Sequence, residues 1–482
     1  MTTAVLLATV PAAPGVPAAT LPLDGTTPLD RLLSQLHGRA GAVHVLTRPA
    51  LAGGLPGAGV TSSADACADL VALADLLDSA PPGPVLLAGA EVVLSEAVLD
   101  VLLADPRPAV TVLVGAPGLS WPLSAPGGVV TAAASPAHRV SAPDASALEV
   151  LRVPQGRRAE VAAVARAAAG GLRGVALLPD AVPSDDALAL LLVALARSGH
   201  RVRTVPLRGF AWARALDEDR ARAGAVRLAE VDEVRARMDA AVKPDDGFFG
   251  TFFVSPYSRH LARAAANAGL TPNQVTVTSM VLGVLAALLF AQGDRLALVA
   301  GALVLHGAFT LDCVDGQLAR YSGQFSSLGA YLDAVSDRIK EYLVYAGLAV
   351  GAGRHGDDVW TLAATALLLQ TAHHALQFSW PGGEQAAVVP REGPLSEPEL
   401  GGGRSASGSA RVAVAVSERT QSRTALRWAK RIVQFPIGER FAVITLGAAL
   451  GGPRVMFSVF LVCVSLALAW SLTGRLLRSV SR

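Results

Sequence analysis

Six apolar segments of helix length follow one another in the C-terminal half of the chain. A helix needs roughly 20 mostly apolar residues to cross the hydrocarbon core of a bilayer, and each segment approaches that length. The whole chain of 482 residues is 52% hydrophobic and only 17% charged, which is apolar for a soluble protein of this size. We therefore predict an all-α membrane domain with six transmembrane helices within residues 241–482. The segments are 274–292, 296–311, 328–350, 359–378, 432–450 and 455–472.

Residues 1–240 have a different pattern, in which short runs rich in valine and leucine alternate with alanine-rich helical stretches. This alternation predicts a Rossmann-like α/β domain with a mainly parallel sheet. The first cation is Arg31, so we expect the apolar N-terminus to be a buried strand and not a signal peptide. The predicted strands are 4–10, 42–47, 84–89, 109–115, 174–179 and 201–207, and the helices are 64–77, 159–169 and 185–198.

Charge and cysteine content add little about function. The net charge is +2, and we expect no nucleic-acid partner. The three cysteines lie far apart without the spacing of metal ligands, so we expect neither a disulfide framework nor a zinc site.

The loop before the fifth apolar segment indicates the orientation in the membrane. Residues 403–431 carry seven basic side chains and one acidic side chain, Glu418. Because cytoplasmic loops are enriched in Lys and Arg, we expect this loop to face the cytoplasm. The chain is then a multi-pass protein of the cell membrane, with both termini, the N-terminal domain and the loop between the second and third spans on the cytoplasmic side.

Four aspartates lie within this apolar region. Asp312 and Asp315 are three residues apart and Asp333 and Asp337 four apart, so each pair projects from one face of a helix. One unpaired acid at membrane depth costs roughly 2.5–3.5 kcal/mol, so four in one place require cations. Oxygen ligands without Cys or His favour Mg²⁺, Mn²⁺ or Ca²⁺. Alternatively, one or two of them cap helices or pair with Arg320, Arg338 or Lys340.

Residues 312–337 read D-x2-D-G-x2-A-R-x8-G-x3-D-x3-D. This pattern resembles the signature of the CDP-alcohol phosphotransferase (CDP-alcohol phosphatidyltransferase) family of membrane enzymes, and the resemblance extends over about residues 243–475. It implies six transmembrane helices, a homodimer and two Mg²⁺ or Mn²⁺ ions. It also implies that Asp312, Asp315 and Asp333 are the chief metal ligands, and that Asp337 is both a ligand and the general base.

The resemblance implies that an acceptor hydroxyl attacks the β-phosphorus of a CDP-alcohol donor while CMP leaves, with Asp337 taking the proton. Gly316 and Ala319 share a helix face with the first two aspartates, where small side chains let a cytosine approach the backbone, and Gly329 offers the same from the third span. Ordinary helix packing is the alternative. Arg320 binds a phosphate or extends to the membrane interface.

Two further cations are candidates for binding a phosphate of the acceptor. Lys340 lies one turn beyond Asp337, and a salt bridge to Asp337 or Glu341 is an equal alternative. Arg440 lies inside the fifth apolar segment, where a charged side chain is a functional candidate, although a pair with Glu439 also accounts for it. The adjacent His373 and His374 are not expected to be catalytic.

The acceptor and donor are not specified by these residues. We prefer an inositol phosphate or a similar polyol phosphate as the acceptor alcohol, and either CDP-diacylglycerol or a CDP-polyol such as CDP-inositol as the donor.

Residues 4–38 resemble the start of sugar-phosphate nucleotidyltransferases, and some relatives fuse an inositol-phosphate cytidylyltransferase to this membrane domain. Residues 9–19 contain no cation to bind a triphosphate, and Ala90 and Glu91 stand where a metal-binding aspartate is expected. We therefore expect a degenerate regulatory or scaffolding domain. A bifunctional cytidylyltransferase and phosphotransferase is the alternative.

Two alternatives belong to other classes of protein. An ion-coupled transporter would carry acids near the membrane midplane within inverted repeats, and the sequence shows neither feature. A non-catalytic membrane anchor is disfavoured because the whole motif lies in the membrane half.

Overall fold

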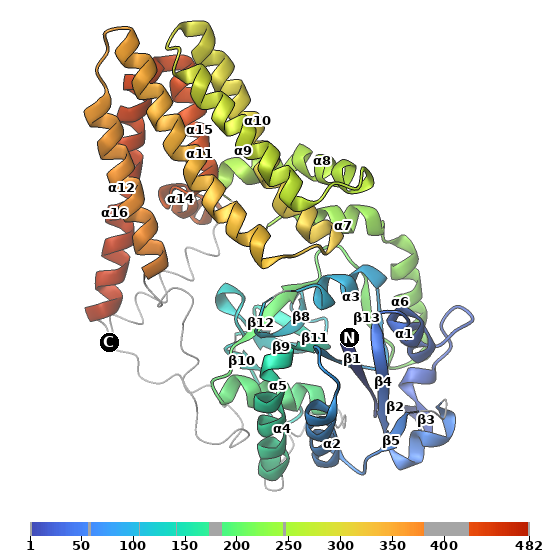
Figure 1. The fold of residues 1–482 in the computed structure, drawn as a ribbon. Coiled ribbons are helices and arrows are strands. Elements are labelled where there is room, and N and C mark those ends of the chain that lie inside the picture. The colour runs from blue at the N-terminus through green and yellow to red at the C-terminus, as the bar shows by residue number, and fades with distance from the viewer. Residues whose placement is uncertain are drawn as a thin grey trace. The chain divides into compact units, whose positions relative to one another are not determined.

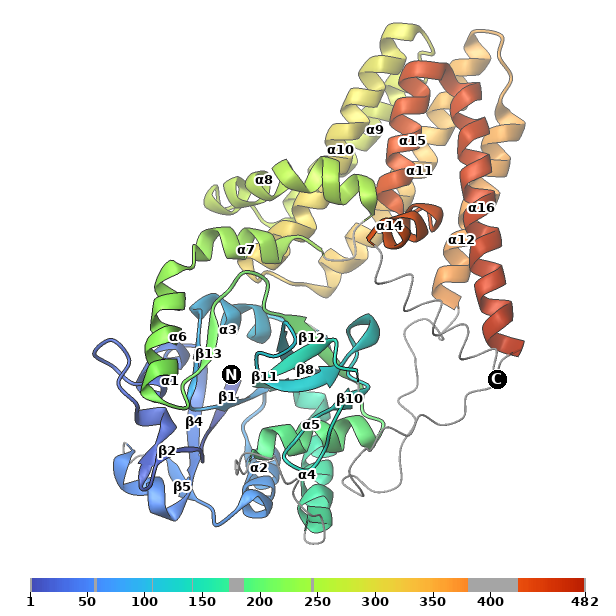
Figure 2. The same cartoon turned by 180° about the vertical axis from the view of Figure 1, so that it is seen from behind.

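A computed structural model of the chain describes residues 2–55, 59–105, 107–140, 142–172, 186–243, 247–379 and 424–480. They form two compact units, one up to Ala236 and the other from Arg237 onward (Figures 1 and 2). The predicted strand 174–179 and most of the basic loop 403–431 lie outside the described residues.

The first unit contains a nine-stranded sheet with the order β10-β9-β11-β6-β1-β4-β5, in which β8 pairs with β11 and with β12. Only β10 and β11 run against the other strands, so the prediction of a mainly parallel α/β sheet is confirmed for the described residues. The strands are β1 (Thr2–Ala8), β4 (Ala40–Thr47), β5 (Val60–Ser62), β6 (Val85–Gly89), β8 (Val110–Gly115), β9 (Trp121–Ser124), β10 (Ala132–Ala133), β11 (Ala145–Val153) and β12 (Val202–Pro206).

The sequence did not predict β11, although this strand is buried along almost its whole length. Its pairing with β8 shifts register between Ala147 and Leu151, and Glu149 has a left-handed φ of 59°. A bulge of this kind interrupts the alternation of apolar and polar residues by which a strand is recognised.

Three helices cover the sheet and match the predicted helical stretches, namely α2 (Ala66–Ser79), α4 (Arg158–Leu172) and α5 (Ala187–Arg197). They bury leucines such as Leu73 and Leu191 against Val5 and Leu87 of the strands. The unit also contains α1 (Pro28–Leu36), α3 (Glu96–Leu103), α6 (Glu218–Glu230) and the short strands β2 (Pro11–Ala13), β3 (Val16–Pro17), β7 (Val92–Leu94) and β13 (Trp212–Arg214).

The second unit is helical, and a long helix occupies each of the six predicted apolar segments. These helices are α9 (Pro272–Phe290), α10 (Arg295–Ser322), α11 (Ser327–Arg354), α12 (Trp360–Ser379), α15 (Ile437–Leu446), which a π-helical turn η6 (Gly447–Gly451) extends, and α16 (Gly452–Val480). Shorter helices are α7 (Glu233–Ala241), which spans the boundary between the units, the π-helical turn η5 (Gly250–Val254), α8 (Ser255–Asn267) and α14 (Thr424–Val433).

Two helix boundaries differ from the predicted apolar segments. The second segment ends at Leu311, but α10 continues to Ser322 and stops at Gly323, which adopts φ 69°. The fifth segment begins at Ile432, but this residue belongs to α14. The helix is interrupted before α15 because Phe435 has a left-handed φ of 51° and Pro436 follows it. Polar residues remain helical in α10 because apolar neighbours on α8 and α9 pack against it.

Three segments among the described residues are long and apolar enough to cross a membrane, namely Pro272–Phe290, Arg295–Ser322 and Ile437–Gly474. They indicate a membrane protein. The last one takes in α15, η6 and α16, and Gly452 with φ 81° and ψ 177° interrupts the helical backbone between η6 and α16. Helix α11 is not among these segments, since it carries five charged residues between positions 333 and 341: Asp333, Asp337, Arg338, Lys340 and Glu341. Three spans are thus supported by length and composition, and six are not confirmed.

Candidate active site

Helices α10 and α11 bring three of the predicted metal ligands together. One oxygen of each of Asp312, Asp315 and Asp333 lies within 4.8 Å of the others. Asp315 is buried, and Thr276 of α9 donates to its Oδ2 at 2.5 Å, which fixes the orientation of the carboxylate. An all-oxygen set of this kind fits Mg²⁺ or Mn²⁺.

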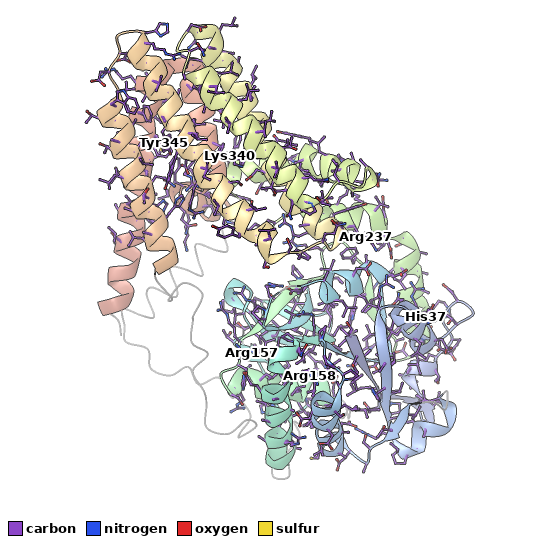
Figure 3. The ribbon with its side chains drawn as sticks, in the orientation of Figure 1. His37, Arg157, Arg158, Arg237, Lys340 and Tyr345 are labelled. Atoms are coloured by element: carbon purple, nitrogen blue, oxygen red, sulfur yellow. The ribbon has the colours of Figure 1, made fainter. Side chains whose placement is uncertain are left out.

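Asp337 lies one turn after Asp333 on α11 and has a different neighbour. Its Oδ1 is 3.3 Å from Nζ of Lys340, and the same ammonium donates to Asp312. Lys340 is fully buried within the helical unit (Figure 3). The predicted salt bridge to Asp337 is therefore present, and a buried ammonium offers no surface to a phosphate of the acceptor.

A pocket of about 190 Å³ opens on one side of the carboxylates. Its lining includes Asp315 and Asp333 together with all four residues predicted to bind the CDP group, Gly316, Ala319, Arg320 and Gly329. A Cβ at Gly316 would meet only the Arg320 guanidinium, at 3.4 Å. Packing therefore does not require glycine there, whereas a larger side chain would occupy the pocket.

Gly329 has a closer constraint, because a Cβ there would lie 2.8 Å from both Asn273 Oδ1 and Ser326 Oγ. Arg320 donates to the backbone carbonyl of Ala241 and lines the same pocket, so its guanidinium is held beside the carboxylates.

A second pocket of about 690 Å³ also reaches the carboxylates. Asp333 lines both pockets, whereas Asp337 lines only the larger one. Four cations surround this larger pocket, and they come from separate parts of the unit: Lys243, Arg338, Lys430 and Arg440. Such a set is suited to an anionic ligand.

Arg440 lies in the first turn of α15, and its side chain contacts two other helices, α11 and α12. Its Nη1 lies 2.8 Å from His374 Nε2 and its Nε 3.4 Å from Glu341 Oε1. Tyr345 donates to Glu341 at 2.7 Å. Glu439, the neighbour considered from the sequence, accepts from the backbone N–H of Phe248 at 2.5 Å.

Sequence reasoning missed Lys243, Lys430 and the polar contacts of His374. A signal was present, since only three of the 41 basic residues are lysines. Two of them line the large pocket and the third, Lys340, lies between Asp312 and Asp337.

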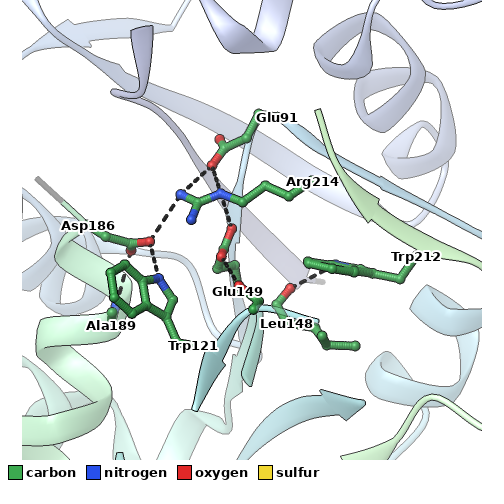
Figure 4. A network of polar contacts seen from close by, with 9 residues as sticks. Glu91, Trp121, Leu148, Glu149, Asp186, Ala189, Trp212 and Arg214 are labelled. Atoms are coloured by element: carbon green, nitrogen blue, oxygen red, sulfur yellow. Dashed lines mark hydrogen bonds and ion pairs between the residues drawn. The ribbon is translucent and has the colours of Figure 1, made fainter. Parts of the chain in front are cut away.

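The first unit has its own buried polar network, centred on Arg214 of β13 (Figure 4). Its guanidinium lies 2.7 Å from Glu91, 2.7 Å from Glu149 and 3.1 Å from Asp186. All three acids are almost completely buried. Glu91 is the residue found where a nucleotidyltransferase is expected to bind metal, and here it pairs with an arginine.

Burial raises the pKa of Glu149 well above its usual value, and the negative charges of Asp186 and Glu91 raise it further. The positive charge of Arg214 and a hydrogen bond from Ser120 oppose this rise in the pKa. The guanidinium of Arg214 is thus shared by three buried carboxyl groups.

Comparison with known proteins agrees with the geometry. Residues 269–381 match the family model of CDP-alcohol phosphatidyltransferase. The archaetidylinositol phosphate synthase of Pyrococcus horikoshii is 35% identical over 91 residues, 19% of this chain and 47% of that protein. The phosphatidylinositol phosphate synthase of Mycolicibacterium smegmatis is 39% identical over 116 residues, 24% of this chain and 51% of that protein. The chain spans about half the length of these curated relatives.

Among solved structures, the inositol-1-phosphate CTP transferase of T. maritima covers 48% of this chain and 97% of its own, with 10% identity and a TM-score of 0.34. A score of this size assigns no activity to the first unit.

We predict that Glu149→Gln changes how stability depends on pH. Because its pKa is raised in the folded state, Glu149 holds its proton there to a higher pH than in the unfolded state, which releases it near the usual pKa of 4.5. The contribution of Glu149 to the free energy of unfolding is therefore full below that pH and falls as pH rises through the folded pKa. Glutamine cannot ionise, so the free energy of unfolding of the variant, relative to that of the wild type, should rise by about 1 kcal/mol or more between pH 4 and pH 8.

Thermal unfolding of the full chain in detergent from pH 4 to pH 9 measures this difference. Glu230→Gln, which changes an exposed glutamate at the end of α6, is the control and should follow the wild type. Equal pH dependence of Glu149→Gln and wild type would contradict the prediction.

Proposed function

We propose that this protein is a membrane transferase that moves a substituted phosphate group from a CDP-alcohol to an acceptor alcohol and releases CMP. The observation that carries the proposal is that Asp333, a member of the carboxylate cluster, lines both pockets. A group transfer requires a donor and an acceptor to meet at one set of catalytic groups.

The smaller pocket is the donor site in this proposal. Gly316 and Ala319 leave room for the cytosine against α10, and Arg320 is held where it can bind a phosphate. Divalent ions at the carboxylates, Mg²⁺ or Mn²⁺, would neutralise the diphosphate of the donor and support in-line displacement. The family resemblance implies two such ions.

The larger pocket is the acceptor site. Arg440, Lys243, Arg338 and Lys430 give it a positive lining, which favours a phosphorylated polyol such as an inositol phosphate over a neutral alcohol. Asp337 lines this pocket and can accept the proton of the attacking hydroxyl. CDP-diacylglycerol or a CDP-polyol is the donor.

The arrangement in the membrane belongs to the same proposal. Helices α9, α10, α11, α12, α15 and α16 form six spans of residues 241–482, and residues 1–240 form a cytoplasmic domain on the side of the active site. Both termini lie on that side, and the protein is a homodimer in the cell membrane.

A panel of acceptors tests the proposal. Purified protein with Mg²⁺ and labelled CDP-diacylglycerol or CDP-inositol should yield CMP and a new phosphodiester with a polyol phosphate, identified by mass spectrometry. Lys430→Met should raise KM for the phosphorylated acceptor about 10-fold with a smaller change in kcat, since one charged contact is worth about 1.5–3 kcal/mol. Arg263→Met, an exposed cation of α8, is the matched control. No product with any acceptor would refute the proposal.

We expect Asp337→Asn to abolish transfer and to preserve binding of the CDP-alcohol, because the amide cannot accept the proton while three carboxylates remain. Product formation and equilibrium binding of the labelled donor measure the two properties. EDTA should remove activity from the wild type, and Mg²⁺ or Mn²⁺, but not Zn²⁺, should restore it. Near-normal turnover by Asp337→Asn would exclude Asp337 as the base.

The first unit is proposed to lack cytidylyl transfer, because Arg214 already neutralises Glu91. The full chain supplied with CTP and a polyol phosphate, without a CDP-alcohol, should release no pyrophosphate. An enzyme-coupled pyrophosphate assay measures this. Release that persists in Asp312→Ala would instead show a bifunctional enzyme that makes its own donor.

A further inference from the structure

The buried ammonium of Lys340 occupies a site that three helices build around it. Nζ donates to Ser279 Oγ of α9 at 3.0 Å and to Asp312 of α10, and it lies 3.3 Å from Asp337 on its own helix α11. Ser279 donates its own proton to the carbonyl of Ala308 at 2.8 Å, so a lone pair of its oxygen is directed to the ammonium.

The stem of the lysine also has a dedicated space. A Cβ at Gly283, one turn after Ser279 on α9, would lie 2.6 Å from Lys340 Cγ. Glycine at this position therefore admits the side chain between α9 and α11. Lys340 is 0% exposed, although burying an ammonium is costly unless it is paired on several sides.

The carboxylates divide into two sets around this cation. Asp312, Asp315 and Asp333 converge on one point, whereas Asp337 does not belong to that group and faces the ammonium. A second divalent ion held between Asp312 and Asp337 would compete with Nζ for the same oxygens and would be repelled by its charge.

We propose that Lys340 replaces the second of the two ions implied by the family resemblance, so that each chain binds one divalent ion, held by Asp312, Asp315 and Asp333. Asp312 is shared between the ion and the ammonium. This inference rests on the proposed metal-dependent function. In it, a side chain of the protein, and not a second ion, supplies the positive charge beside Asp337.

The test counts ions without measuring activity. Full-length protein is stripped of metal in detergent and titrated with Mn²⁺ alone, with free Mn²⁺ followed by electron paramagnetic resonance. Wild type should bind one Mn²⁺ per chain. Lys340→Met keeps an unbranched side chain for the space beside Gly283 but removes the charge, and it should bind two. Arg354→Met, an exposed cation in the last turn of α11, is the matched control and should bind one.

The number of bound ions distinguishes a failure of the proposed role of Lys340 from a failure of the proposed metal site. Two ions in wild type would overturn the role of Lys340 and leave the transferase proposal standing, and no ion would overturn the metal site itself. One ion in wild type and one in a folded Lys340→Met would show that the lysine does not exclude the second ion. The wild-type count decides the central point even where the variant does not fold.

Discussion

The helical unit depends on how it compensates the negative charge of four aspartates placed among apolar helices. Coulomb repulsion between carboxylates in a medium of low dielectric would force α10 and α11 apart. Two contacts oppose this repulsion: the ammonium of Lys340 lies between Asp312 and Asp337, and the hydroxyl of Thr276 donates to Asp315. A divalent ion bound by the converging carboxylate oxygens would oppose it further. The ammonium is paired only because α9 and α11 approach closely at Gly283 and Gly347, where a Cβ would meet the facing helix.

Both units use a buried cation against buried acids, but with different consequences. In the first unit Arg214 contacts Glu91, Glu149 and Asp186 together. In the second unit Lys340 engages two aspartates, and the others remain at the wall of a pocket. This difference is why the proposed function places the reaction in the helical unit.

Much of the site could be predicted because charged residues in an apolar segment have few structural uses. Four aspartates at helical spacing and small residues on the same face depend on local sequence, and the structure contains both as local features. The burial of Lys340 depends on Gly283 and Ser279, about 60 residues earlier, and the acceptor-side lysines meet from positions 243 and 430. Contacts over such separations leave no periodic signal in the sequence. In β11, the bulge also removes the alternation of apolar and polar residues that normally marks a strand.

The division of the site between helices has a consequence for specificity. The small pocket is lined by α9, α10 and the first two turns of α11, which lie within the segment that matches the family model. The large pocket takes Lys430, Pro436, Arg440 and Trp470 from α14, α15, α16 and the connections between them, all beyond that segment. Asp333 is common to both pockets, and Asp337 one turn later faces only the second. In the proposed function, the residues of the larger pocket can therefore vary in sequence without disturbing those of the smaller pocket, because the two linings have only Asp333 in common. In that proposal, likeness in the motif is for this reason evidence about the donor chemistry, whereas the acceptor has to be inferred from the cations of the larger pocket, of which Lys243, Lys430 and Arg440 lie outside the matched segment.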